Sequence, residues 1–105
     1  MKVLFDQGTP VPLRAYLTHH GVSTAYEMGW STLKNGELLT TGEAQGFEIL
    51  VTTDTSLKYQ QNLQIRKIGI IVLLSTSWPK IRQRVDAVIA AVDSARSGSY
   101  TEVPI

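Results

Sequence analysis

The chain contains no cysteine, which excludes disulfide bonds and thiolate metal ligands and is typical of a reducing compartment. It also lacks an excess of one charge. Ten Lys and Arg stand against nine Asp and Glu, a net charge of +1, so any site for a polyanion must be local. The longest apolar run, residues 68–74, is far shorter than the roughly 20 residues of a membrane span. The first residues lack a charged segment followed by an apolar run. We therefore expect no signal peptide, no membrane partner and a cytoplasmic location.

The composition is that of a globular protein. Of the 105 residues, 43% are hydrophobic and 18% are charged, which is enough apolar surface for one domain with one core. No repeat, low-complexity segment or linker interrupts the chain. The sequence therefore predicts a single domain over residues 1–105, in which residues 97–105 form either a last strand or a tail.

Strand-like and helix-like segments alternate along the chain. Apolar or β-branched runs predict strands at residues 2–5, 22–27, 48–52, 68–74 and, more briefly, 100–103. Helical periodicity, proline and glycine signals predict helices at residues 10–20, 35–45, 56–64 and from 77 onward. The last of these carries an apolar stripe of Trp78, Ile81, Val85, Val88, Ile89 and Val92. This alternation predicts an α/β fold, a mostly parallel sheet with helices on both faces.

The stretch STLKNGELLTT, residues 31–41, allows two interpretations. Asn35 followed by Gly36 between apolar residues is typical of a hairpin. However, the adjacent leucines at 38 and 39 break strand alternation, Asn is a good helix N-cap, and Glu37 would lie in a first helical turn, where the dipole favours a carboxylate. We therefore predict a helix from Asn35 to about Gln45 that ends at Gly46.

Acidic residues follow two of the predicted strands. Asp6 follows the first strand and Asp54 follows the run LVTT, so both should lie at the carboxyl edge of the sheet, where ligands of such folds bind. Glu37 could join them from a helix N-terminus. Clustered carboxylates repel one another unless a cation is present, and Mg²⁺ takes oxygen ligands. A bound ion can activate water and offset charge on a phosphodiester.

Each of these acids also has a purely structural interpretation. Asp6 and Asp54 would then cap the turn or helix that follows each of them, and Glu37 would interact with its helix dipole. Similarly, Thr9 is predicted either to hydrogen-bond near Asp6 or to cap the first helix. The polar segment that contains Lys58 and Gln61 either positions RNA phosphates or forms a solvated surface.

Five segments, taken together, carry a resemblance to a known family. They are VLFDQGTPVPLR, GWSTLKNGELL, GFEILVTTD, YQQNL and IIVLLSTSWP, and they cover nearly the whole chain. The chain resembles the PIN-like domains, in particular small bacterial single-domain proteins related to toxin–antitoxin ribonucleases. This resemblance implies an α/β/α sandwich of four or five parallel strands and an acidic pocket that binds Mg²⁺ or Mn²⁺ and cleaves single-stranded RNA. It makes Asp6 the first metal ligand and Asp54 the acid after the central strand. The opening FDQGT is also similar to that of haloacid dehalogenase-like phosphatases, but the second aspartate of that motif is absent.

The chain departs from the family pattern at two positions. Many relatives have an aspartate at the position of Asn35, and in this chain the nearest acid, Glu37, lies two residues later. Many relatives also have a second acid at the position of Ser56. The pocket would hold either three acids, Asp6, Asp54 and Glu37, or two acids and an amide. Residues predicted to contact substrate are Thr9, Asn35, Ser56, Lys58 and Gln61. The alternative is a catalytically degenerate module that binds a partner protein or RNA. The resemblance also implies an antitoxin-like partner and a homodimer.

Overall fold

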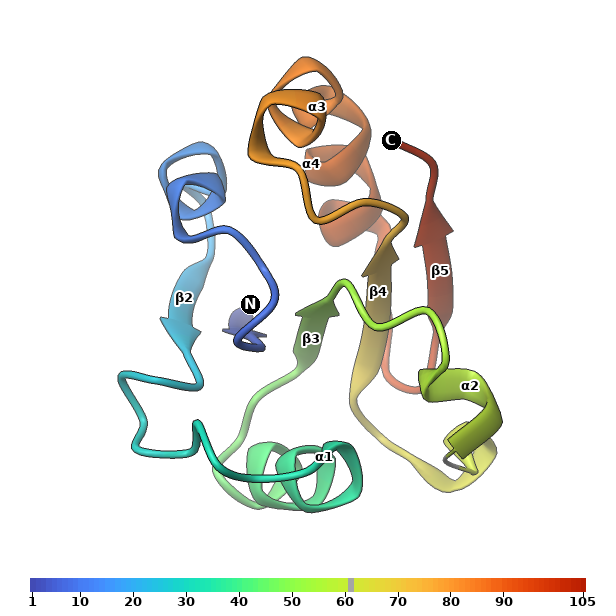
Figure 1. Ribbon diagram of the computed structural model, residues 1–105. Helices are drawn as coiled ribbons and strands as arrows, with labels where there is room; N and C mark the ends of the chain where they lie inside the picture. Colours follow the sequence, from blue (N-terminus) through green and yellow to red (C-terminus); the bar gives the residue numbers. More distant parts are fainter. Residues whose placement is uncertain (61) are drawn as a thin grey trace.

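The computed structural model describes residues 1–60 and 62–105 as five parallel strands in one sheet (Figure 1). The order across the sheet is β2-β1-β3-β4-β5, and all four neighbouring pairs are parallel. The strands are β1 (Lys2–Phe5), β2 (Gly21–Thr24), β3 (Ile49–Thr52), β4 (Gly69–Leu73) and β5 (Tyr100–Val103). This sheet confirms the predicted fold class, and residues 100–103 form the last strand rather than a tail.

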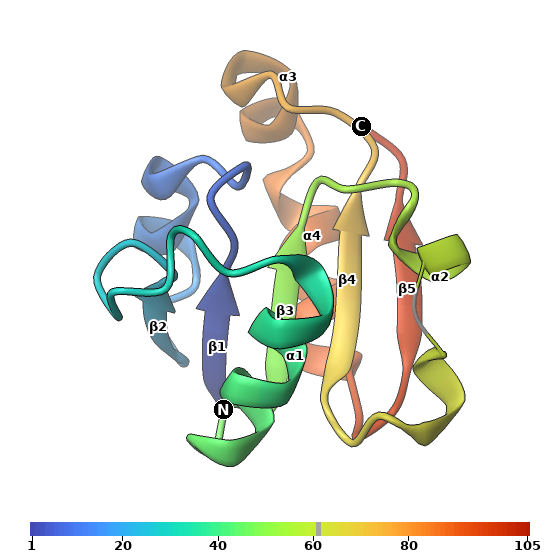
Figure 2. The ribbon, with the colours of Figure 1, turned by 60° about the horizontal axis from the view of Figure 1, so that its bottom comes forward.

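Helices cover both faces of the sheet, which makes the fold a three-layer α/β/α sandwich (Figures 1 and 2). The helices are η1 (Val11–Tyr16), α1 (Asn35–Ala44), α2 (Leu57–Gln60), η2 (Leu63–Ile65), α3 (Trp78–Gln83) and α4 (Val85–Ser94). Elements η1, α3 and α4 lie on one face, while α1 and α2 lie on the other. None of the helices in the described residues has both the length and the apolar character needed to cross a membrane.

Strand side chains alternate between two separate cores, because successive residues of a strand point to opposite faces. The first core joins Val3, Phe5, Ile49, Val51, Ile71 and Leu73 to Leu13 of η1 and to Ile81, Val88 and Val92 of the last two helices. The second core joins Leu4, Leu50, Ile70 and Val72 to Leu38, Leu39 and Leu57. Every residue of β3 and β4 is buried, as expected for central strands covered on both faces.

Four predicted elements differ from those observed, one of them the single helix expected from residue 77, which is divided at Arg84 into α3 and α4. The helix expected at residues 10–20 is a shorter 3₁₀ helix, η1, and the chain leaves helical geometry at Leu17. The strand expected at 22–27 ends at Thr24, because Thr24 and Glu27 form a reciprocal turn in which each backbone N–H donates to the other side chain. The helix expected at 56–64 is divided into α2 and η2, with residue 61 outside the described residues. The helix predicted at 35–45 is confirmed as α1, so the hairpin interpretation is wrong.

The connection from β4 to β5 differs in hand from the other three. In Figure 2 the strands run from β2 on the left to β5 on the right, with α1 in front. The first three connections are right-handed, because η1 passes behind the sheet to the left and α1 and α2 pass in front to the right. Helices α3 and α4 also lead to the right, but they pack on the same face as η1. This last crossover is therefore left-handed, a rare arrangement in parallel sheets.

Candidate acidic site at the carboxyl edge of the sheet

The direction of the chain across the sheet reverses at β1. Strand β2 lies on one side of β1 and β3 lies on the other, so the carboxyl ends of β1 and β3 flank the switch point where ligands of open parallel sheets bind. Asp6 directly follows β1, and Asp54 is the second residue after β3. The structure therefore places both predicted aspartates at this edge.

The Asp6 carboxylate is held by three donors from the chain. Its Oδ1 accepts a hydrogen bond from the Gly8 N–H at 3.1 Å, and the Thr9 hydroxyl lies 2.8 Å from the same oxygen. Its Oδ2 accepts a hydrogen bond from the Thr52 hydroxyl. Burial raises the pKa of Asp6, and the hydrogen bonds from Thr52, Thr9 and Gly8 oppose that rise. The predicted position of Thr9 beside Asp6 is thus observed, and the Thr9 hydroxyl also lies 2.8 Å from the Val51 carbonyl oxygen.

The pKa of the Asp54 carboxylate is shifted in the opposite direction, downward. Its Oδ1 accepts hydrogen bonds from the backbone N–H and the hydroxyl of Ser56, at 2.9 and 2.7 Å. Its Oδ2 accepts one from the side-chain amide of Asn35 at 2.5 Å. These donors, the Ser56 hydroxyl foremost, lower the pKa of Asp54. The two neighbouring acids are therefore shifted in opposite directions, an arrangement typical of sites in which two carboxyl groups have different tasks.

Thr52, the last residue of β3, links the two aspartates. Its hydroxyl donates to Asp6 Oδ2 and accepts a hydrogen bond from the Asp54 backbone N–H at 3.0 Å. The side chain is buried, with 1% of its surface exposed, in a strand whose other residues are all apolar. The sequence analysis did not identify Thr52, although a threonine in a buried run next to an acid was the available signal.

Asn35 and Glu37 both lie in the first turn of α1, but their side chains bond different groups. Lys34, rather than Asn35, is the N-cap of α1, so the expectation that Asn35 caps the helix is wrong. Asn35 is instead the first helical residue, and its side-chain nitrogen reaches Asp54 and lies 3.2 Å from Gln60 Oε1. The Glu37 carboxylate turns back to accept a hydrogen bond from the Lys34 N–H at 3.3 Å. It lines a separate open pocket with Thr40 and Arg66.

The acids brought together are thus Asp6 and Asp54, without Glu37. Across residues 1–60 and 62–105, no three His, Cys, Asp or Glu side chains form a group suited to a metal ion. Of the remaining predicted residues, Ser56 bonds Asp54, whereas Lys58 forms an ion pair with Glu102 at 3.0 Å. Gln61 lies outside the described residues.

Two pockets adjoin the Asp6 carboxylate. The larger one has a volume of about 340 Å³ and is lined by Asp6, Gln7, Thr9, Val11, Arg14, Thr24, Tyr26 and Glu27. The smaller one, of about 130 Å³, is lined by Asp6, Gln7, Gly8, Ala25, Trp30, Ser31, Leu33, Asn35 and Leu38. Asp6 and Gln7 belong to both linings, so these two residues lie between the two pockets.

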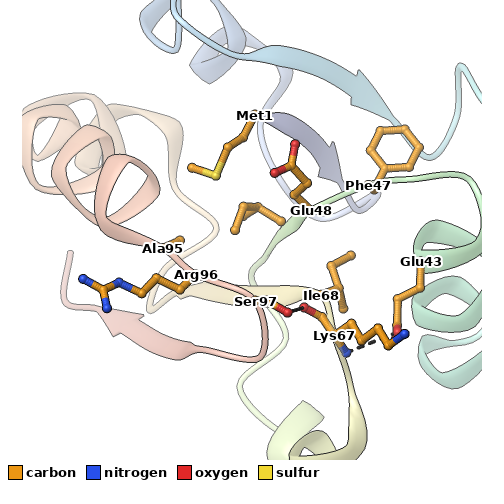
Figure 3. Close-up of a pocket in the computed structure, with 10 residues that line it drawn as sticks. Met1, Glu43, Phe47, Glu48, Lys67, Ile68, Ala95, Arg96 and Ser97 are labelled. Atoms are coloured by element: carbon orange, nitrogen blue, oxygen red, sulfur yellow. Dashed lines mark hydrogen bonds between the residues drawn. The ribbon is translucent and has the colours of Figure 1, made fainter.

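A further pocket, of about 370 Å³, lies at the opposite edge of the sheet and is built differently (Figure 3). There, Glu43 Oε2 accepts a hydrogen bond from the Lys67 backbone N–H at 3.2 Å, and the Ser97 hydroxyl donates to the Lys67 carbonyl at 2.6 Å. The side chain of Arg96 points away from this pocket (Figure 3). These contacts hold together the segments that precede β4 and β5, which favours a structural role.

The oxygen donors at the carboxyl edge, two carboxylates and the hydroxyls beside them, are of the chemical kind that binds hard divalent cations. Neither Asp6 nor Asp54 forms an ion pair within the described part of the chain, so their charge is not balanced by Lys, Arg or His there. The surrounding groups are carboxylate and hydroxyl oxygens, ligand types that Mg²⁺ and Mn²⁺ prefer, whereas the Asn35 amide presents its nitrogen to Asp54. In comparisons with known proteins, no protein-family model, no curated protein and no solved structure matches this chain.

Proposed function

We propose that the chain is a metal-dependent endoribonuclease that cleaves single-stranded RNA, with Asp6 and Asp54 holding a Mg²⁺ or Mn²⁺ ion. The observation that carries this proposal is the pair of aspartates at the ends of two adjacent strands, in which Thr52 bonds the Asp6 carboxylate and the Asp54 backbone N–H, and neither carboxylate has an ion-pair partner in the described residues. When bound, such an ion supplies an activated water and offsets the negative charge of the phosphodiester. The resemblance to PIN-like domains supplies RNA as the substrate class.

The chain's own residues have distinct tasks in this proposal. Thr52 holds the Asp6 carboxylate and the Asp54 backbone beside each other, and Thr9 orients Asp6. Asn35 and Ser56 keep Asp54 ionised, because both donate to its carboxylate. Glu37 takes part only through water, since its carboxylate caps α1. Lys58 is paired with Glu102, whose charge offsets its own, so it offers no free cationic side chain to RNA.

The decisive experiment is cleavage of a labelled single-stranded RNA in Mn²⁺ by the parent protein and by Asp6→Asn. Loss of a metal ligand should reduce cleavage by more than the roughly 10- to 100-fold effect of a residue that only orients a ligand. EDTA should abolish cleavage by the parent. Glu48→Gln provides a matched carboxylate-to-amide control, because Glu48 lies at the opposite edge of the sheet. Undiminished cleavage by Asp6→Asn would show that the assignment of Asp6 is wrong.

One observation favours the second candidate, a module that binds RNA or a protein without cleaving RNA. Both oxygens of Asp54 are occupied by neutral donors, Asn35 and Ser56, at positions where relatives often have acids. If the parent neither cleaves RNA nor binds Mn²⁺ in calorimetry, this second function is supported. The toxin role, with an antitoxin-like partner, and a homodimer are further proposals that depend on the family resemblance. Co-expression with a neighbouring antitoxin-like protein and measurement of molar mass in solution test them.

A further inference from the structure

We propose that the larger pocket beside Asp6 is a subsite for one nucleobase of the RNA, with Tyr26 as the stacking wall. This subsite deepens the proposed function and rests on it for the identity of the polymer. The pocket lies between the ends of β1 and β2 and has a volume of about 340 Å³, at the lower end of the range for small-ligand sites. One ring of nucleobase size fits such a volume.

The charges in the pocket disfavour a phosphate group as the ligand. Arg14 is the cationic residue of its lining, and its guanidinium is bonded to Glu27 by two contacts of 3.1 and 2.5 Å. Hydrogen bonding by Arg14 lowers the pKa of Glu27, so both partners are charged at neutral pH and cancel each other. Among the described residues, no other Lys, Arg or His lines the pocket, so the lining offers no unpaired cationic side chain to a phosphate. A neutral ring therefore suits this pocket better than a phosphate group.

The walls of the pocket offer apolar and aromatic surface that the fold does not cover. Tyr26 is 76% exposed and Val11 is 55% exposed, and both line the pocket. A tyrosine ring provides a flat surface on which any base can stack. Gln7, also exposed at the rim, offers an amide that can donate to and accept from the edge of a base.

The backbone positions these groups firmly. Tyr26 belongs to the turn closed by Thr24 and Glu27, in which the Thr24 N–H donates to Glu27 Oε1 at 2.9 Å and the Glu27 N–H donates to Thr24 Oγ1 at 3.1 Å. The ion pair of Glu27 with Arg14 ties this turn to η1. The backbone that carries Tyr26 is thus held in place without a ligand, and the pocket adjoins the carboxylate proposed to act on the backbone of the same RNA. A base held here would place its neighbouring phosphate near Asp6.

The test uses adenosine and ribose 5-phosphate as separate probes, titrated in EDTA and followed by NMR. Adenosine should shift the signals of Tyr26 and its neighbours, whereas ribose 5-phosphate, which has no base, should not. Tyr26→Ala should weaken adenosine binding about tenfold, the loss expected for one base–aromatic stack, and Tyr26→Phe should retain it. Tyr59→Ala is the matched control, because Tyr59 is 81% exposed on α2, outside this pocket. Thermal unfolding should show that all three variants are folded.

The same variants in the RNA cleavage assay separate the subsite from the nuclease function. Tyr26→Ala should raise KM for RNA with kcat unchanged. If the parent cleaves RNA while Tyr26→Ala alters neither KM nor adenosine binding, the subsite is wrong and the nuclease stands. If the parent does not cleave RNA but binds adenosine through Tyr26, the nuclease is wrong and the base site stands. Failure of adenosine to bind, or equal shifts with ribose 5-phosphate, overturns the subsite.

Discussion

The carboxylates at the two edges of the sheet have different hydrogen-bond and ion-pair partners. At the amino edge, Glu43 pairs with Arg66 at 3.4 Å and accepts a hydrogen bond from the Lys67 N–H, while Glu48 accepts one from the Lys2 N–H. At the carboxyl edge, Asp6 and Asp54 receive hydroxyl and amide donors and form no ion pair within the described residues.

This difference separates structural acids from acids available to a ligand. The Glu43 carboxylate is neutralised by the Arg66 guanidinium, so it has little charge left to attract a cation. A carboxylate that is partly buried among neutral donors keeps its charge unbalanced, which is unfavourable for stability and favourable for binding a positive ion. Three pairs of variants test the two edges, and a comparison of the parent with one further variant tests an acid away from both, from the largest expected effect to the smallest.

Glycine substitutions at the two edges should differ most. A Cβ at Gly69, the first residue of β4, would lie 2.5 Å from the Arg96 carbonyl oxygen and 2.9 Å from Ile49 Cδ1, so backbone must shift. A Cβ at Gly8 would lie 2.5 Å from the Thr53 hydroxyl, which can rotate away. We expect Gly69→Ala to lower the free energy of unfolding by about 3 kcal/mol and Gly8→Ala by less than about 1 kcal/mol. Urea denaturation measures both, and equal losses would contradict the packing difference.

Thr52→Val should damage the carboxyl edge specifically. Valine has the same shape, but it leaves Asp6 Oδ2 without its donor and the Asp54 N–H without its acceptor. We expect cleavage to fall about tenfold and the free energy of unfolding to fall by about 1–2 kcal/mol. Thr52→Ser, which keeps the hydroxyl, is the control for cleavage kinetics and urea denaturation. Parent-like kinetics in Thr52→Val would exclude a linking role.

Replacing a carboxylate by its amide should change stability in opposite directions at the two edges. Glu43→Gln removes the charge that balances Arg66, so the free energy of unfolding should fall by about 1 kcal/mol. Asp6→Asn removes an unbalanced charge whose burial raises the pKa of that carboxyl, so the fold should gain stability in EDTA. Thermal unfolding at pH 7 without metal measures both. A fall in Tm for both variants would remove the distinction between the edges.

The smallest expected effect concerns an acid that is paired away from both edges. Glu102 accepts hydrogen bonds from Lys58 and from the Tyr100 hydroxyl, both at 3.0 Å. Desolvation and the hydrogen bond to Glu102 raise the pKa of Tyr100 from 10.0 to about 12. Because the folded-state pKa exceeds the unfolded one, this contribution is complete below pH 10 and is lost as the pH rises to about 12. The Tm of the parent should therefore fall more steeply over this range than that of Tyr100→Phe; parallel curves would contradict the assignment.

Much of the fold could be predicted from local patterns. The apolar runs of β3 and β4 and the alternation with helices were sufficient to predict a parallel sheet, and an acid that directly follows a buried strand must lie at its carboxyl end. The hand of the last crossover could not be predicted. The stripe of Ile81, Val88 and Val92 shows that the helices have a buried face, but not which face of the sheet they cover.

The details of the site could not be predicted, because they depend on contacts between distant parts of the chain and on exact helix and strand ends. The link through Thr52 depends on two strands that are adjacent in space and distant in sequence, since Thr52 and Asp6 are 46 residues apart. The position of Asn35 depends on the exact residue at which α1 begins, which periodicity does not determine. The exposed wall at Tyr26 exists because Thr24 and Glu27 end β2 earlier than its β-forming residues suggest.

The register of β1 and β3 fixes the distance between the backbones of Asp6 and Thr52. Phe5 pairs with Val51, so Asp6 and Thr52 stand one step further along two hydrogen-bonded strands, whose spacing in any sheet is about 4.8 Å. The Asp54 N–H donates a hydrogen bond to the Thr52 hydroxyl, which holds the Asp54 backbone beside this pair. The sheet therefore fixes the Asp6 carboxylate and the Asp54 backbone through Thr52, whereas Ser56 and Asn35 orient the Asp54 carboxylate. A change in the loop after β3 would move the Asp54 carboxylate while Asp6 keeps its bond to the strand.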